Sequence, residues 1–185
     1  MQEVKADVTP GQYLTFHLGT DEYALGILQV REIIGLESVT RVPGVPAWIR
    51  GVINLRGHVV PIIDLALKFG LPRGDIDRRP GIVIADAALE GEKTVVGILV
   101  DGVGQVIDFL PQDLEPAPSF GTRIRSDFLR GMGKADRRLI PILDVDCLLT
   151  ADELLAAESA RDGAEAAAAG QDAAEAAEPP GAEVP

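Results

Sequence analysis

Residues 48–65, WIRGVINLRGHVVPIIDL, contain the pattern that decides the fold. Two runs rich in β-branched and aliphatic residues, 51–55 and 58–63, flank Arg56-Gly57. A short turn in which the glycine takes a positive φ would join them as a β-hairpin. Aromatic residues make up only 4% of the chain, so Val, Ile and Leu must fill the core, which also favours strands. The stretch predicts a mainly β protein.

The same pattern returns eighty residues further along the chain. Residues 128–131 repeat 48–51, and 139–145 repeat the strand, proline and aspartate of the first copy. A weaker echo, at an offset of seventy-three, sets 30–33 against 103–106. Two long matches at one offset indicate a duplication. We therefore expect two similar small β-barrels that share a hydrophobic seam, because neither is large enough to be stable alone.

Local signals predict the remaining elements. Asp64 and Asp144 are each predicted to cap a helix. The helix after Asp64 is expected over 65–69, and the helix after Asp144 is expected to run to about Ala157. Pro61 lacks an amide hydrogen and is expected at a sheet edge or a bulge. Strands are predicted at 12–18 (half-buried), 23–25, 81–85, 94–100, 104–109, 129–133 and 139–143, with turns at 86–92 and 134–138.

Composition divides the chain into a short disordered lead (1–11), a folded body (12–157) and an acidic tail (158–185). From Ala156 to Pro185, thirteen of thirty residues are alanine, and seven acidic residues face one basic residue. Such a segment has almost nothing to bury, so we expect it to be disordered. The N-terminus has no secretory h-region and the apolar runs are too short to span a membrane, which predicts a cytoplasmic protein.

The residue inventory argues against most chemistry. A net charge of −12 offers no basic surface for nucleic acid. Cys147 is the only cysteine, which excludes an intramolecular disulfide, and we expect it to be a buried, inert thiol. His17 and His58 are expected at the surface, and no motif for metal, phosphate or an activated nucleophile occurs. We therefore expect no cofactor, no metal and no catalysis.

One enzymatic alternative remains open at this point, a hydrolase on the duplicated scaffold. Aspartic proteases carry one catalytic aspartate in each of two β-rich halves. Asp64 and Asp144 occupy such places, but neither lies in the Asp-Thr/Ser-Gly loop that this chemistry needs. Helix capping explains both residues better.

Several motifs of the body are shared with one protein family. They are YLTF at 13–16, EYAL at 22–25, VREI at 30–33, WIRGVINLRG at 48–57, VPIIDL at 60–65, VGILVDGV at 96–103 and IPILD at 140–144. With them the chain resembles the CheW family of chemotaxis adaptor (coupling) proteins over about residues 12–155. The run from Arg50 to Gly57, followed by the Pro-Ile-Ile-Asp-Leu block, is the most specific part of this resemblance.

The resemblance implies a mainly β fold of two intertwined five-stranded SH3-like barrels, with short helices and a C-terminal helix. It implies a non-catalytic adaptor that couples the cytoplasmic tips of chemoreceptors (methyl-accepting proteins) to the regulatory domain of the histidine kinase CheA. Rings formed with that domain are also implied. The acidic tail is a departure from the family pattern.

Carried over by position, six residues become candidates for contact with receptor or kinase, undivided between the two: Val30, Glu32, Asn54, Leu55, Arg56 and Val103. Gly51 and Gly57 are interpreted instead as backbone requirements of tight turns. We further expect Glu32 and Arg56 to approach each other.

Overall fold

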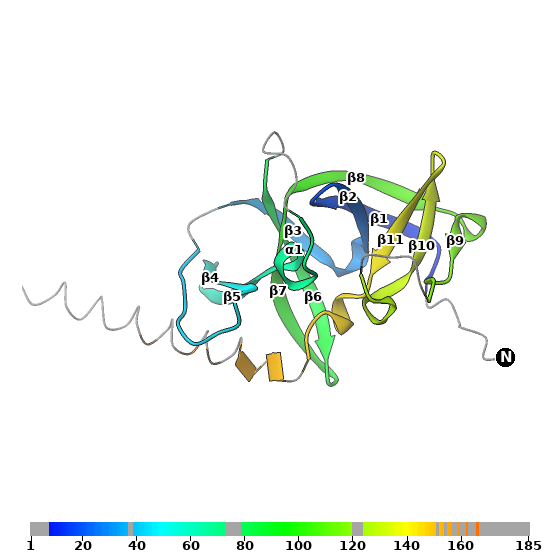
Figure 1. Cartoon of the computed structure of the whole chain (residues 1–185). Helices are drawn as coiled ribbons and strands as arrows, with labels where there is room; N and C mark the ends of the chain where they lie inside the picture. Colours follow the sequence, from blue (N-terminus) through cyan, green and yellow to red (C-terminus); the bar gives the residue numbers. More distant parts are fainter. Residues whose placement is uncertain are drawn as a thin grey trace, which may run out of the picture.

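The computed structural model describes residues 8–36, 39–72, 79–119 and 124–150, and beyond them only Asp152, Glu153, Leu155, Ala156, Ser159, Asp162 and Ala166. The described part is built mainly from β-strands, with short helical turns at their ends (Figure 1). The strands are β1 (Gly11–Leu18), β2 (Asp21–Gly26), β3 (Val30–Gly35), β4 (Ile49–Leu55), β5 (His58–Asp64), β6 (Gly81–Leu89), β7 (Glu92–Val100), β8 (Gly102–Phe109), β9 (Leu114–Glu115), β10 (Leu129–Ala135) and β11 (Arg138–Leu143). The helices are α1 (Leu65–Lys68) and the 3₁₀ turns η1 (Ile27–Gln29), η2 (Pro111–Asp113), η3 (Ser126–Phe128) and η4 (Val145–Cys147).

The strands form two sheets whose orders match. One is six-stranded, β8-β1-β2-β11-β10-β9, and the other is five-stranded, β3-β6-β7-β5-β4. Each sheet contains a hairpin from one half of the chain, β1-β2 or β6-β7, inserted between strands from the other half. The hairpins are joined to their hosts by parallel pairs, Ile62 with Gly97 and Ile142 with Ala24. The predicted mainly β fold with two intertwined, similar units is confirmed, but one sheet has six strands instead of the expected five, because the two-residue strand β9 adds to its edge.

The offset of eighty residues recurs in the hydrogen bonds. The amide of Asp64 donates to the carbonyl of Trp48 (2.8 Å), and the amide of Asp144 donates to the carbonyl of Phe128 (2.9 Å). β4 and β10 are both irregular in register at their second residues. The duplication seen in the sequence is therefore a duplication of structure.

The core consists of one shared cluster and one cluster within each sheet. The shared cluster draws on both sheets and includes Phe16, Leu25, Ile63, Val83, Ile98 and Leu143. The six-stranded sheet encloses Tyr13, Ala24, Phe109, Ile140 and Ile142, and the five-stranded sheet encloses Ile53, Val60, Ile62, Ile82 and Ile84. These clusters are the two barrel interiors and the seam that the sequence predicts.

Because apolar clusters lie on both sides of β1, this strand is not half-buried as predicted. Leu14 and Phe16 face the shared cluster, while Tyr13 faces the interior of the six-stranded sheet. Thr15 is also buried, and its hydroxyl bridges the backbone of Gln105, donating to its carbonyl (3.1 Å) and accepting from its amide (2.9 Å).

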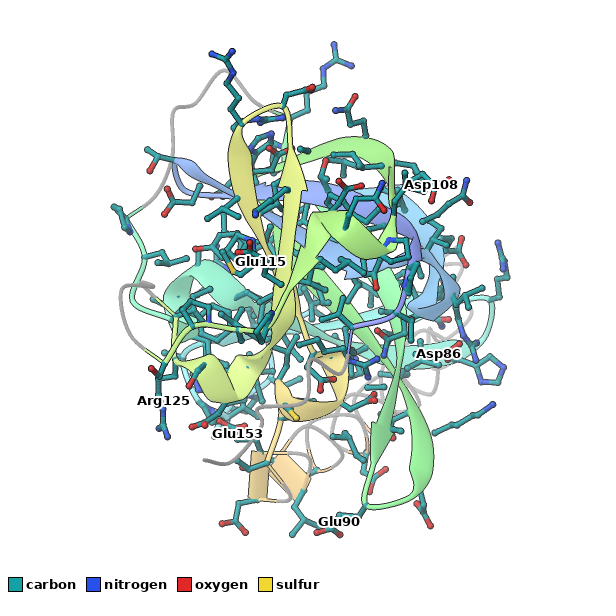
Figure 2. The ribbon with its side chains drawn as sticks, turned by 90° about the vertical axis from the view of Figure 1, so that its right-hand side faces the viewer. Asp86, Glu90, Asp108, Glu115, Arg125 and Glu153 are labelled. Carbon is teal, nitrogen blue, oxygen red and sulfur yellow. The ribbon has the colours of Figure 1, made fainter. Side chains whose placement is uncertain are left out.

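Two further local predictions need correction. The segment 86–92 was predicted to be a turn, but β6 continues to Leu89, and Ala87 and Leu89 are buried. The turn consists only of Glu90-Gly91, at the tip of a projecting hairpin (Figure 2). Pro61 lies on β5, which is flanked by β4 and β7 rather than at an edge. Proline is tolerated here because no neighbouring strand needs its amide hydrogen. Val52, opposite Pro61 on β4, uses its backbone amide and carbonyl to bond Thr40, and the pairing with β7 begins only at Ile62.

Both predicted aspartate caps form, but the helical segments that they begin differ in length. Asp64 accepts from the amide of Leu67 (3.0 Å) and caps α1, as predicted. Asp144 caps only the 3₁₀ turn η4, and the chain becomes helical again at Asp152. Thr150 and Glu153 exchange side chain–backbone hydrogen bonds in a capping box at that point (2.7 and 3.3 Å). The lead at 1–7 and most of the tail at 158–185 lie outside the described residues, so the disorder predicted for them stays a prediction.

Candidate functional site

Two of the predicted site residues form a side-chain contact between the two edges of the five-stranded sheet. Glu32 lies on β3 and Arg56 at the end of β4, the strands at opposite edges of the sheet. The Nη2 atom of Arg56 lies 3.1 Å from the Oε2 atom of Glu32. The expectation that these side chains approach each other is confirmed. A salt bridge therefore spans the open side of the barrel.

Arg56 is held in place by the hairpin turn rather than by packing. Arg56 and Gly57 both take positive φ, 52° and 84°, as in a two-residue turn whose twist matches that of the strands. The side-chain oxygen of Asn54 accepts a hydrogen bond from the amide of Gly57 (3.0 Å). The side chain of Arg56 is 78% exposed and that of Glu32 only 26%. The backbone of the turn, stabilised by the Asn54 hydrogen bond, thus directs the Arg56 side chain toward solvent.

The other candidate residues lie around this salt bridge at different depths. Leu55 is half-buried and packs on the cluster inside the five-stranded sheet, together with Ile34 and Val39. Val30 is also half-buried but packs against the shared cluster. Val103 lies on β8 in the other sheet, where it lines a shallow pocket with Ile33. The structure therefore groups Glu32, Asn54, Leu55 and Arg56, and places Val30 and Val103 at its margins.

The structure requires glycine more strictly at position 51 than at position 57. Its φ is +140°, and a Cβ there would lie 2.1 Å from the carbonyl oxygen of Thr40. Gly57 also has a positive φ, but a Cβ there would meet nothing within 4 Å. Both values support the interpretation of these residues as backbone requirements, and Gly51 carries a steric requirement in addition.

Two ion pairs related by the duplication were not found from the sequence. The Nε atom of Arg50 lies 3.5 Å from Asp64, and the Nε atom of Arg130 lies 3.1 Å from Asp144. The carboxylate that Arg50 faces is only 5% exposed. The signal was available, because the eighty-residue repeat aligns arginine with arginine and aspartate with aspartate. Both aspartates are occupied by capping and by arginine, which removes the structural basis for a protease dyad.

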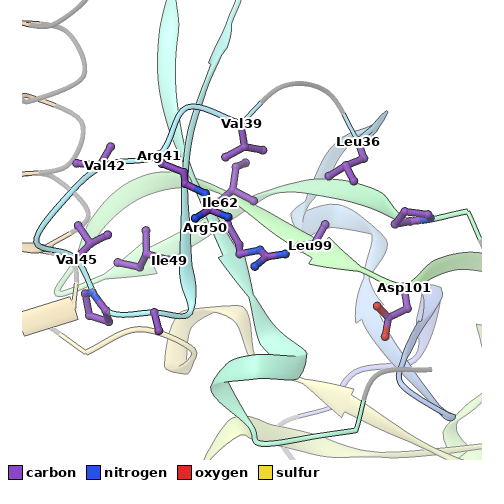
Figure 3. Close-up of a pocket in the computed structure, with 13 residues that line it drawn as sticks. Leu36, Val39, Arg41, Val42, Val45, Ile49, Arg50, Ile62, Leu99 and Asp101 are labelled. Atoms are coloured by element: carbon purple, nitrogen blue, oxygen red, sulfur yellow. The ribbon is translucent and has the colours of Figure 1, made fainter. Parts of the chain in front are cut away.

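A groove runs beside β4 and is lined mainly by apolar side chains (Figure 3). Its volume is about 600 Å³. Two arginines, Arg41 and Arg50, point into it from the loop before β4 and from β4 itself. Val39 lines this groove and also packs on the cluster inside the five-stranded sheet, on which Leu55 packs as well.

Cys147 is exposed, not buried as predicted. The 3₁₀ turn directs Val145 and Leu148 inward and leaves Cys147 between them on the outside. Partial desolvation raises the pKa of this thiol above its ordinary value, and the negative charge of Asp144 raises it further. A raised pKa disfavours the thiolate, so the thiol is a poor nucleophile despite its exposure.

The surroundings of the two histidines agree only in part with prediction. His58 is exposed, as expected, whereas His17 is half-buried and its carbonyl accepts from the amide of Asp101 (2.9 Å). Among the residues that the structure describes, no group of three or more His, Cys, Asp or Glu side chains is arranged to hold a metal ion. None of the helices in the described part of the chain has the length and apolar character of a transmembrane segment.

Comparison with known proteins places this chain in a family. The model of the CheW-like domain matches residues 12–153. The chemotaxis protein CheW of Klebsiella aerogenes is 39% identical over 150 residues, covering 80% of this chain and 88% of that protein. CheW of Bacillus subtilis is 35% identical over 146 residues, covering 78% and 90%. The crystal structure of the scaffolding protein TtCheW from Thermoanaerobacter tengcongensis superposes with a TM-score of 0.69 at 32% identity, covering 78% of this chain and 96% of that one. The chain belongs to the CheW family.

Proposed function

We propose that this protein couples chemoreceptor tips to the regulatory domain of the CheA kinase in the cytoplasm, and that the Glu32–Arg56 surface makes one of the two contacts. Membership of the CheW family, whose members are non-catalytic adaptors in chemotaxis, supports the proposal. The observation that carries the choice of surface is the salt bridge across the open side of the five-stranded sheet. Neither partner is assigned to it in preference to the other.

The exposure of this salt bridge indicates that it serves binding more than folding. An exposed ion pair contributes only about 0–1 kcal/mol to stability. Arg56 is 78% exposed, and its turn is already fixed by the backbone and Asn54, so the fold gains little from the charge. A partner that covers Arg56 would exclude water from both charges, and a mismatched charge at such an interface costs roughly 2–5 kcal/mol.

The neighbouring residues supply what a partner surface needs besides charge. Loop and turn residues on a rigid scaffold are common places for binding function. Leu55 offers a half-buried apolar side chain beside Arg56, and Val30 lies two residues before Glu32 on the same strand. A mixed surface with an apolar centre and a charged rim is typical of protein–protein contacts. Val103 would extend it toward the second sheet.

The test is charge reversal at position 56 with a matched control. Arg56→Glu is expected to fold normally and to weaken binding to a receptor tip or to the CheA regulatory domain by roughly 30-fold or more, as 2 kcal/mol or more implies. Arg125→Glu is the control, because Arg125 is also 78% exposed and also forms an exposed ion pair, with Asp127 (2.6 Å) (Figure 2). Affinities can be measured by calorimetry with each partner separately.

The double variant Glu32→Arg/Arg56→Glu restores the pair with its charges exchanged. Partial recovery of binding relative to Arg56→Glu would show that the geometry of the pair matters as well as the sign of its charge. Wild-type affinity of Arg56→Glu for both partners would refute the assignment of this surface.

A further inference from the structure

The groove beside β4 has an apolar lining that carries two arginines, Arg41 and Arg50, and one carboxylate, Asp101, which lies at the end away from Arg41 (Figure 3). Its apolar walls come from the loop before β4 and from neighbouring strands, and include Val42, Val45, Ile49 and Leu99. Arg41 is exposed and, within the described residues, has no ion-pair partner. The chain as a whole is acidic, with a net charge of −12. The arginine-bearing end of the groove is therefore a local site for an anionic segment with small apolar side chains.

The C-terminal segment leaves the body beside this groove. The Nζ atom of Lys68, at the end of α1, lies 2.8 Å from Oε2 of Glu153 and also donates to the carbonyl of Leu148. The same Nζ lies 4.4 Å from the centre of the Trp48 ring. Trp48 is flanked in sequence by Ala47 and Ile49, and both line the groove. Lys68 thus links Glu153 to Trp48, whose two sequence neighbours line the groove.

The composition of the last nineteen residues complements the groove. Residues 167–185, which come after the last described residue, contain four acidic residues, no basic residue and eight alanines, and they end in Val184-Pro185. From Glu153 to Ala166 a helix would rise about 20 Å. Nineteen further residues span about 25 Å as a coil, enough to return over that distance. A tethered segment of this reach has an effective concentration in the millimolar range, so even weak attraction is sufficient for contact.

We propose that residues 167–185 occupy the groove of the same molecule, with tail carboxylates at Arg41 and Arg50 and alanine side chains against the apolar walls. The tail is then an intramolecular ligand whose acidic side chains decide how often the groove is covered. This inference concerns the free protein and does not depend on the identity of its partners.

Paramagnetic broadening in the full-length chain tests the proposal without any partner. Cys147→Ser removes the exposed native thiol, and Val184→Cys provides a single position for a nitroxide label near the C-terminus. We expect the amide signals of residues 39–47 and of Leu99 to lose at least half their intensity, while those of β10 and β11 keep theirs. Arg41→Glu should reduce the ratio of docked to free tail about tenfold and restore the signals. Arg137→Glu, an exposed arginine on the β10–β11 turn, is the control and should change nothing.

Two further samples separate the alternatives. Replacing the tail acids in Asp172→Asn/Glu175→Gln/Glu178→Gln/Glu183→Gln should restore the groove signals without touching the body, so the test survives if Arg41→Glu fails to fold. A mixture of isotope-labelled chain without nitroxide and unlabelled chain with nitroxide should show no broadening. Broadening in this mixture would show contact between copies and overturn the intramolecular proposal. Equal broadening over the whole surface, or none, would also overturn it.

Discussion

Replacing Gly51 by alanine is expected to destabilise the protein far more than the same change at Gly57. Both positions have a positive φ, which costs an alanine about 1–2 kcal/mol. At Gly51 the new Cβ would also lie 2.1 Å from the carbonyl oxygen of Thr40, a backbone atom that no side-chain rotation can move. The segment carrying Thr40 must therefore shift away from β4.

That shift breaks a specific pair of hydrogen bonds. The amides and carbonyls of Thr40 and Val52 bond to each other reciprocally, at 2.9 Å in both directions. Each contributes about 1 kcal/mol net. Together with the backbone strain, Gly51→Ala should cost about 3–4 kcal/mol, against about 1–2 kcal/mol for Gly57→Ala. For a domain of this size these values correspond to falls in Tm of about 10 °C and about 4 °C.

The assay is thermal and urea denaturation of both variants, with wild-type as reference. Urea midpoints give the free-energy difference if the m-value is unchanged. Equal destabilisation by the two substitutions would refute the reasoning, because the contact with Thr40 would then contribute nothing beyond the φ penalty.

Three other expectations concern the C-terminal segment and the lone thiol. Lys68→Met should lower Tm by about 3–8 °C in a melting curve. The substitution leaves the Glu153 carboxylate without its buried partner and removes the donor to the Leu148 carbonyl. An unchanged Tm would mean that these contacts do not hold the C-terminal segment on the body. Truncation after Ala157 keeps that contact, so Tm should stay within a few degrees of wild type, and a larger fall would show that the removed residues stabilise the body. Alkylation of Cys147 by iodoacetamide should reach half its maximal rate at a higher pH than alkylation of free cysteine, because the pKa of the Cys147 thiol is raised. Asp144→Asn should lower the pH of this midpoint. A midpoint below that of free cysteine would contradict the desolvation argument.

The features predicted correctly from the sequence are those written in contiguous residues. The Arg56-Gly57 hairpin needs only two apolar runs and a glycine, and the Asp64 cap needs only its neighbours. The duplication is also visible in the chain, because both copies kept their arginine and aspartate. The approach of Glu32 and Arg56 is an exception, because it joins opposite edges of a sheet; it was expected because both residues belong to the same barrel and the hairpin turn projects Arg56.

The features that were missed depend on contacts between distant segments. β1 was predicted to be half-buried, with Tyr13 and Thr15 on its exposed face. Both are buried because the β1-β2 hairpin is inserted between strands from the other half of the chain. Cys147 lies among apolar residues in sequence, but a 3₁₀ turn has a period of three and separates it from them. The ion pair of Arg50 with Asp64 joins two strands, and its only sign in the sequence is the alignment of both residues with Arg130 and Asp144 in the second repeat.

The exchange of hairpins between the two halves has a consequence for the history and the use of this fold. Each half contributes its first hairpin to the other, which is the arrangement of a domain-swapped dimer joined into one chain. A dimer of identical subunits must show the same surface twice. Once the copies are fused, each can change alone, and here one carries Arg56-Gly57 at its tip and the other Asp136-Arg137. The two halves therefore present different turn residues at equivalent positions, where two identical subunits would present the same turn twice.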